Sequence, residues 1–226
     1  MLILFKQFHR LALSQGLYPV VLSTLFAFTL LAGRVYLSRQ WTYLFLVWNL
    51  FLAWIPYLTS LWTSPVYPRQ SRRWGYLLLP GLLWLAFFPN APYIVTDFLH
   101  LQHRPPVPVW YDMGLISIFA WTGLFLAVFS LRAMQMLVKT AAGPVLSWLF
   151  VVSVMGLSGL GIYIGRFLGW NSWDLFIHPE AVLTDILIRF TNPFQHTATF
   201  GVSLMFALFL LVCYLTVTAD SLHRQS

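Results

Sequence analysis

The sequence of 226 residues is 59% hydrophobic and only 8% charged, which leaves too few polar side chains to cover a soluble domain of this size. Its formal net charge is +7, but the basic residues form no stripe interleaved with exposed aromatic residues, so the charge does not indicate nucleic-acid binding. It fits positively charged cytoplasmic loops and contact with anionic membrane lipids instead. The single cysteine, Cys213, excludes an internal disulfide and any metal site built on several cysteines.

Six apolar stretches are each long enough to cross about 30 Å of hydrocarbon as a helix. The period-2 pattern of a membrane β-barrel is absent, so we predict an all-α polytopic membrane protein. No linker or long repeat divides the chain, and residues 1–226 are therefore expected to form a single transmembrane domain. The predicted spans are Leu17 to Gly33, Trp41 to Trp62, Tyr76 to Thr96, Val109 to Leu131, Pro144 to Gly165 and Thr197 to Thr218.

Short basic segments determine the predicted orientation, because positively charged loops are retained in the cytoplasm. The predicted cytoplasmic set comprises Lys6, Arg10, Arg69, Arg72, Arg73, Arg132, Lys139 and Arg224. We therefore predict a plasma-membrane protein with both termini in the cytoplasm. Arginines also occur on the opposite side, so the reversed orientation is the alternative. On the predicted orientation, five of the six acidic residues lie in or beside the outer loops, and only Asp220 lies inside.

Two asparagines lie inside predicted spans at the same depth. At a rise of about 1.5 Å per residue, Asn49 and Asn90 both lie about 10 Å below the outer surface. They either belong to a polar funnel that receives a substrate or form a hydrogen bond between two packed helices. The same depth count brings Asp112, Arg166 and His196 to the outer interface. These five residues are the candidate substrate-binding residues.

The third span ends in the stretch FFPNAPYIVTDFLH, which contains two prolines close together. Each proline removes a backbone donor and strains the preceding turn, so we predict a break in the helix at Pro89 to Pro92. A broken membrane helix is tolerated where it lines a wet cavity or is buried in protein. The alternative to a cavity is a packing kink whose carbonyl groups bond to a neighbouring helix.

Beyond this break, Asp97 and His100 are three residues apart, and in the last outer loop Asp174 and His178 are four residues apart. Either spacing places a carboxylate and an imidazole on one face of a helix. A mixed oxygen and nitrogen set suits zinc, manganese or iron, so we predict one divalent metal ion held by these four side chains. The spacings match no HExxH motif, and the alternative is a set of interfacial loop residues that face water.

The last outer loop also contains the stretch PEAVLTDILIRF, which combines an N-terminal proline with a one-sided apolar face. We predict a short helix from Pro179 to Phe190 that lies in the membrane interface. In the fifth span, Gly161 and Gly165 have the GxxxG spacing that lets two membrane helices approach closely. A partner helix is therefore predicted at these two glycines.

The stretches FFPNAPYIVTDFLHL, WYD and GRFLGWNSWD resemble a prokaryotic membrane family known as domain of unknown function 1361. The resemblance extends over nearly the whole chain. It implies a multi-pass prokaryotic membrane protein, but it implies no activity and therefore assigns no catalytic residue.

Three classes of function remain open on these residues. A metal-dependent enzyme that acts on lipid or lipid-linked substrate at the outer leaflet is favoured by the acids and histidines on one side. A transporter or channel is favoured by the broken third helix, although no ionisable residue lies at the midplane. The glycine face favours an assembly or partner-binding protein. Membrane lipids are expected partners in each case.

Overall fold

The computed structural model describes residues 13, 15–66 and 75–223. These residues contain six helical stretches that are long and apolar enough to cross a membrane, and they contain no strand, which confirms the predicted all-α polytopic class. In chain order the helices are α2 (Leu17–Ser38), α3 (Phe45–Val66), α4 (Gly75–Phe87), α5 (Asn90–Tyr93), the 3₁₀ helix η1 (Ile94–His100), α6 (Val109–Ala142), α7 (Pro144–Tyr163), the π-helix η2 (Ile164–Leu168), α8 (Asp174–Ile177), α9 (Pro179–Thr191) and α10 (Thr197–His223).

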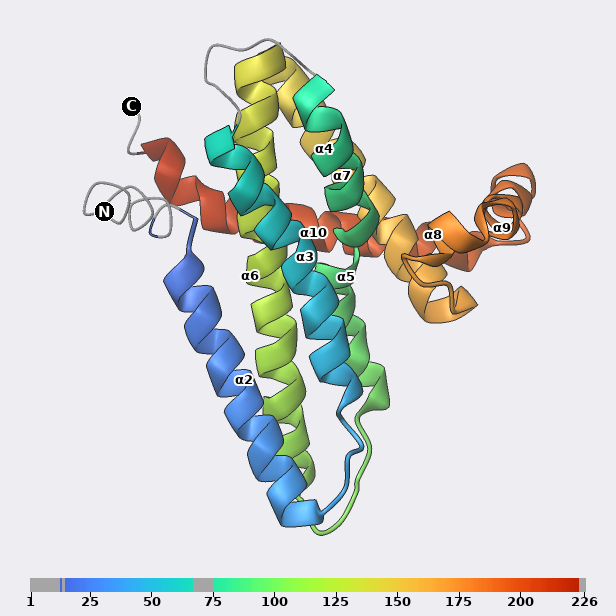
Figure 1. Ribbon diagram of the computed structural model, residues 1–226. Coiled ribbons are helices and arrows are strands. Elements are labelled where there is room, and N and C mark those ends of the chain that lie inside the picture. Colours follow the sequence, from blue (N-terminus) through green and yellow to red (C-terminus); the bar gives the residue numbers. More distant parts are fainter. Residues whose placement is uncertain (1–12, 14, 67–74, 224–226) are drawn as a thin grey trace.

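The long helix α6 lies at the centre of the bundle, and α2, α3 and α7 pack against it (Figure 1). Side chains on several faces of α6 are almost fully buried, among them Leu115, Ala127 and Val128. The surface of the bundle has the opposite character, because large apolar side chains such as Leu22 and Leu25 of α2 are exposed. Such a surface is stable in hydrocarbon and unfavourable in water, as expected for an integral membrane protein.

The absence of a side chain at Gly123 of α6 allows α5 to lie directly against this central helix. A Cβ atom at Gly123 would lie 2.4 Å from the carbonyl oxygen of Ala91, which is much closer than such atoms can approach. The contact therefore requires glycine, and it fixes the position of the broken third span relative to the core.

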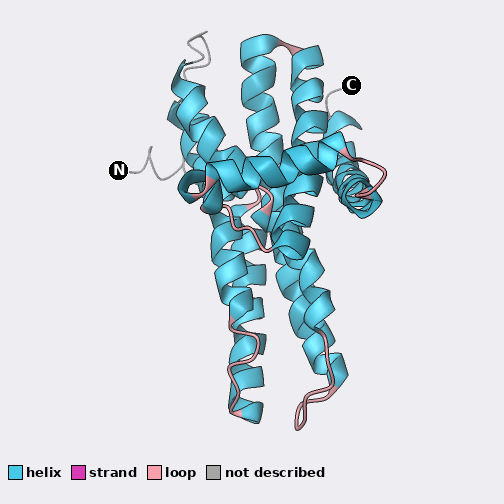
Figure 2. Ribbon diagram, turned by 90° about the vertical axis from the view of Figure 1, so that its right-hand side faces the viewer, coloured by secondary structure: helices cyan, strands magenta, loops and turns pink. Residues whose placement is uncertain are grey.

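The last two helices of more than one turn, α9 and α10, differ in direction from the rest of the bundle. α10 packs mainly on α7 and crosses behind α6 at a steep angle in Figure 1. Figure 2 views the molecule from the side on which α9 lies and shows this helix running across the direction of the long helices. The predicted helix from Pro179 to Phe190 is confirmed as α9, and its direction is the one that a helix lying in a membrane interface adopts.

Several predicted span boundaries are wrong by more than one turn, and burial explains the differences. The first span was expected to end at Gly33, but α2 continues to Ser38 because the Arg34 side chain is buried in an ion pair. The fourth span was expected to end at Leu131, but α6 continues to Ala142 because Met134 and Leu137 pack against neighbouring helices. Most of the residues that carry the predicted orientation, namely Lys6, Arg10, Arg69, Arg72, Arg73 and Arg224, lie outside the described residues.

Candidate functional site

The third span is interrupted at the predicted position, since α4 ends at Phe87 and α5 begins at Asn90. Pro89 has no amide hydrogen to donate, so the regular helical bonding pattern cannot continue through it. The Asn90 amide compensates, because its Nδ2 atom donates to the carbonyl oxygen of Phe87 at 2.9 Å and to Oγ of Ser172 at 2.7 Å. The break is therefore stabilised partly by its own asparagine and partly by the loop that follows η2.

After the break, the chain tightens into the 3₁₀ helix η1, in which residues three apart lie above one another. Asp97 and His100 have this spacing, and both side chains contact Arg166 from the π-helix η2. Nη2 of Arg166 donates to Oδ1 of Asp97, and Nη1 lies 2.7 Å from Nε2 of His100. Arginine can only donate, so Nε2 of His100 accepts and the neutral ring carries its proton on Nδ1.

The Asp97 carboxylate is fully buried and is held by two further elements. Nδ2 of Asn49 in α3 donates to its second oxygen, Oδ2, at 2.8 Å. Arg166 is anchored in turn, because its Nε donates to Oγ1 of Thr96 at 2.7 Å and its guanidinium stacks 4.3 Å from the centre of the Tyr93 ring. A buried charge pair needs such additional bonds to offset the loss of hydration. The pair therefore joins α3, η1 and η2 into one rigid unit.

A cavity of about 140 Å³ lies beside this unit, between the broken third span, α3, α7 and the α8–α9 segment. The polar residues in its lining are Asn49, Asn90, Tyr93, Asn171 and Ser172. The rest of the lining is apolar or aromatic: Trp48, Leu52, Ala86, Pro89, Gly161, Ile164, Gly165, Trp170, Leu175, Val182 and Ile186. None of these lining residues carries a charge.

The amphipathic helix α9 closes one side of the cavity. Val182 is only 2% exposed, and Ile186 lies on the same side and also lines the cavity. A polar contact holds the helix in place, because Nε1 of Trp170 donates to Oδ2 of Asp185 at 2.7 Å. Arg189 lies one turn further along α9, and its Nη1 is 3.5 Å from Oδ1 of Asp185.

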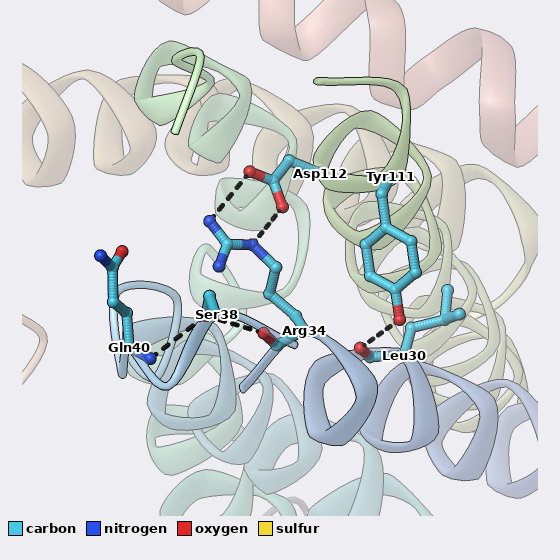
Figure 3. A network of polar contacts seen from close by, with 6 residues as sticks. All are labelled: Leu30, Arg34, Ser38, Gln40, Tyr111 and Asp112. Atoms are coloured by element: carbon cyan, nitrogen blue, oxygen red, sulfur yellow. Dashed lines mark hydrogen bonds and ion pairs between the residues drawn. The ribbon is translucent and has the colours of Figure 1, made fainter. Parts of the chain in front are cut away.

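A second buried ion pair joins α2 to α6 at the end of the bundle where α2 ends (Figure 3). Nε of Arg34 donates to Oδ1 of Asp112 at 2.6 Å, and the two side chains are 1% and 0% exposed. Nη1 of Arg34 has no hydrogen-bond partner among the described residues, but the guanidinium lies 5.5 Å from the centre of the Tyr43 ring. Figure 3 also shows Tyr111 reaching across to the Leu30 carbonyl oxygen, a bond of 2.8 Å.

The structure thus separates the five candidate substrate-binding residues. Asn49 and Asn90 line the same cavity, and Arg166 lies beside them without lining it. Asp112 is paired with Arg34 in a different part of the bundle. His196 lies in the turn before α10, where its backbone amide donates to the Pro193 carbonyl oxygen at 3.2 Å.

The four predicted metal ligands do not form one ligand set in the structure. Asp97 is enclosed by Arg166 and Asn49, whereas Oδ2 of Asp174 accepts bonds from the backbone amide and the side chain of Asn171. His178 is exposed at the junction of α8 and α9. Within the described residues, no three histidine, cysteine or acidic side chains lie in an arrangement that could hold a metal ion.

The predicted partner-helix face is covered by the chain itself. A Cβ atom at Gly161 would lie 2.9 Å from Cγ of Pro89, and one at Gly165 would lie 3.2 Å from the Tyr93 ring. The two glycines therefore let α7 and η2 approach the broken third span closely, and the cavity lies at this contact.

Sequence reasoning did not identify Arg34, Tyr93, Trp170, Asn171 or Ser172 as site residues. For Arg34 a signal existed, because it directly follows the first predicted span and Asp112 lies in the first turn of the fourth, so the sequence places two opposite charges at span ends where they can pair. No sequence signal distinguishes the other four from ordinary loop or interface residues, since their role depends on how α7 and α9 fold back onto the third span.

Comparison with known proteins adds a family and no activity. No curated protein and no solved structure matches this chain. The family model described as protein of unknown function (DUF1361) matches residues 48–213, which include the broken third span, the Asp97–Arg166 pair, the cavity and α9. The resemblance to this family is thereby confirmed over residues 48–213, and the chain, with its six helices long and apolar enough to cross a membrane, belongs to the DUF1361 family.

Proposed function

We propose that this protein recognises a lipid or lipid-linked substrate and holds its polar headgroup in the cavity beside the broken third span. The observation that carries the proposal is a small cavity inside an apolar bundle, whose lining includes three asparagines, a tyrosine and a serine. Polar groups at this depth are unfavourable unless they serve packing or a ligand. On the predicted orientation the cavity lies in the outer half of the membrane, because Asn49 and Asn90 line it and lie about 10 Å below the outer surface.

The helix α9 supports a ligand that has both a polar and an apolar part. Its inner side contributes Val182 and Ile186 to the cavity, whereas Leu183, Leu187 and Phe190 are exposed. Exposed side chains of this kind favour insertion among the acyl chains of the bilayer. A headgroup in the cavity would then lie directly beside the hydrocarbon that receives its own tail.

The Asp97–Arg166 pair supports a preformed cavity. It ties Asn49 of α3 and Tyr93 of α5 to the π-helix η2, so the polar groups are held without a ligand. Preorganised groups lose little conformational entropy on binding, which favours affinity for a small headgroup. π-helical turns also occur frequently at functional sites.

A metal-dependent enzyme that acts on this substrate stays a prediction from the sequence. Its test is the metal content of the purified protein and of the His100→Ala and His178→Ala variants. Metal that is present in the wild type and lost from both variants would support the prediction. Metal that is retained by both variants would refute the predicted ligand set.

Transport is a second candidate function, and the break at Pro89 and Asn90 is the observation that favours it. Discontinuous membrane helices form substrate sites in many transporters. A cysteine at Ala86 should then react with a small aqueous thiol reagent from either side of the membrane. Reaction from one side alone would favour a binding site over a translocation pathway.

The lipid-binding proposal is tested by filling the cavity. Ala86 lines it, and Ala86→Leu adds three carbon atoms to a preformed space, at a cost of about 1–3 kcal/mol if a headgroup must still fit. The matched control is Ala198→Leu, an exposed position at the start of α10.

Native mass spectrometry of protein extracted in a polyoxyethylene detergent measures the retained lipid. Wild type and the Ala198→Leu control should retain a lipid, whereas Ala86→Leu should retain about tenfold less. Equal retention by Ala86→Leu and wild type would refute the proposal.

A further inference from the structure

We infer that the headgroup recognised in the cavity is an uncharged, hydroxyl-rich group, of which the sugar of a glycolipid or lipid-linked saccharide is the chemical class. This inference rests on the proposed function, and it names the substrate class of the same site. Its first basis is that none of the residues that line the cavity carries a charge.

Two charged side chains next to the cavity, those of Arg166 and Asp185, are already paired. All three guanidinium nitrogens of Arg166 are engaged, by Asp97, Thr96 and His100. Asp185 accepts from Trp170 and lies beside Arg189. A phosphate entering the cavity would find no available cation in its lining, and an ammonium group would find no available carboxylate, so either would lose hydration without a compensating partner.

The neutral polar groups define what the ligand must supply. The hydrogen bonds of the Asn49, Asn90 and Asn171 side chains all use Nδ2 as the donor. Within the described part of the chain, Oδ1 of each asparagine accepts no hydrogen bond, so each of these three lining residues keeps one unused acceptor. A ligand that donates several hydrogen bonds without carrying charge satisfies them, and hydroxyl groups meet both conditions.

Aromatic residues in the lining of the cavity also fit a sugar headgroup. Trp48, Trp170 and Tyr93 line the cavity together with the amides. Rings that are apolar on their faces and polar at one edge suit a ligand that combines hydroxyl groups with C–H surfaces. One side of the Tyr93 ring is covered by the Arg166 guanidinium, and the Trp48 ring already contacts the Phe51 and Trp173 rings, so we assign the stacking contact to Trp170.

The test is a competition among three lipids that share dioleoyl chains. Wild-type protein in a polyoxyethylene detergent is mixed with equimolar monoglucosyl diacylglycerol, phosphatidylglycerol and phosphatidylcholine, and native mass spectrometry counts each adduct. Phosphatidylglycerol carries hydroxyl groups with a negative charge, and phosphatidylcholine carries a quaternary ammonium group. The glucosyl lipid should exceed each of them about tenfold, because it alone avoids burying a charge.

Two asparagine variants test whether the glucosyl headgroup is bound by an asparagine that lines the cavity. Asn171→Leu removes one acceptor and should lower the glucosyl adduct about three- to tenfold, the loss expected for one hydrogen bond. Asn192→Leu is the matched control, because Asn192 follows α9 and does not line the cavity, and it should leave the adduct unchanged.

The outcomes separate this inference from the proposed function. Equal binding of the three lipids, or preference for either charged headgroup, with loss of binding in Ala86→Leu would overturn the sugar class and leave lipid recognition standing. Binding that Ala86→Leu does not reduce would overturn both.

Discussion

Replacing Arg166 with methionine should lower the free energy of unfolding by about 3–5 kcal/mol, because it leaves a charge buried without its partner. The Asp97 carboxylate is 0% exposed, and after the change only Nδ2 of Asn49, at 2.8 Å, would still donate to it. The lost bonds to Thr96 and His100 add less, since His100 is exposed and water can replace Arg166 there.

The measurement is a titration of the protein from mixed micelles with dodecyl sulfate, followed by far-ultraviolet circular dichroism. Arg189→Met is the control, because it removes an ion pair in which Asp185 is 36% exposed, and it should change stability by less than about 1 kcal/mol. The double variant Asp97→Leu with Arg166→Met should recover most of the loss, since it replaces the buried pair by apolar groups. A loss below about 1 kcal/mol in Arg166→Met would refute the buried pair.

Three further predictions follow from other parts of the bundle. Gly123→Ala should lower the free energy of unfolding by about 1–3 kcal/mol in the same titration, because its Cβ would lie 2.4 Å from a backbone oxygen, whereas Gly201→Ala, where a Cβ meets nothing within 4 Å, should not. Burial and the charge of the neighbouring aspartate raise the pKa of the Tyr43 phenol above its ordinary value of 10.0, so the stability linked to this group is complete below pH 10 and is lost as the pH rises through the folded-state pKa. In Tyr43→Phe the free energy of unfolding should fall less steeply with pH above pH 10, and the same slope as in the wild type would contradict this prediction. In a variant without Cys213, a cysteine at Glu180 should react with an impermeant thiol reagent on intact cells and one at Ser71, which lies outside the described residues, should not; the opposite result would reverse the predicted orientation.

The membrane class, the six spans and α9 could be predicted from the sequence because they depend on local composition and periodicity. The break at Pro89 could be predicted for the same reason, since proline acts on its own turn. The partners of Asp97 could not be predicted from the sequence. Asp97 and His100 share a face as their spacing indicates, but the group that they meet is the Arg166 side chain, brought from the fifth span.

The predicted metal site and the observed contacts with Arg166 thus involve the same two residues, Asp97 and His100. A carboxylate and an imidazole on one face satisfy either a metal ion or a guanidinium, and their spacing does not distinguish the two. The discriminating fact is the sequence separation of 69 residues between Asp97 and Arg166, which only the tertiary fold closes. The same holds for Ser172 and Asn90, whose contact spans 82 residues.

The Arg34–Asp112 pair affects how the protein inserts into the membrane while the ribosome is still synthesising it. The two residues are 78 positions apart, so at a synthesis rate of about 5–20 residues per second Arg34 exists for roughly 4–16 s before Asp112 is made. During that interval the first span carries a charge that has no partner, so Arg34 must stay at the headgroup level, where a long side chain reaches water. The first span therefore reaches its final depth in the membrane only after the fourth span has been synthesised. In a nascent chain arrested before residue 112, the first span should lie closer to the membrane surface than it does in the complete protein.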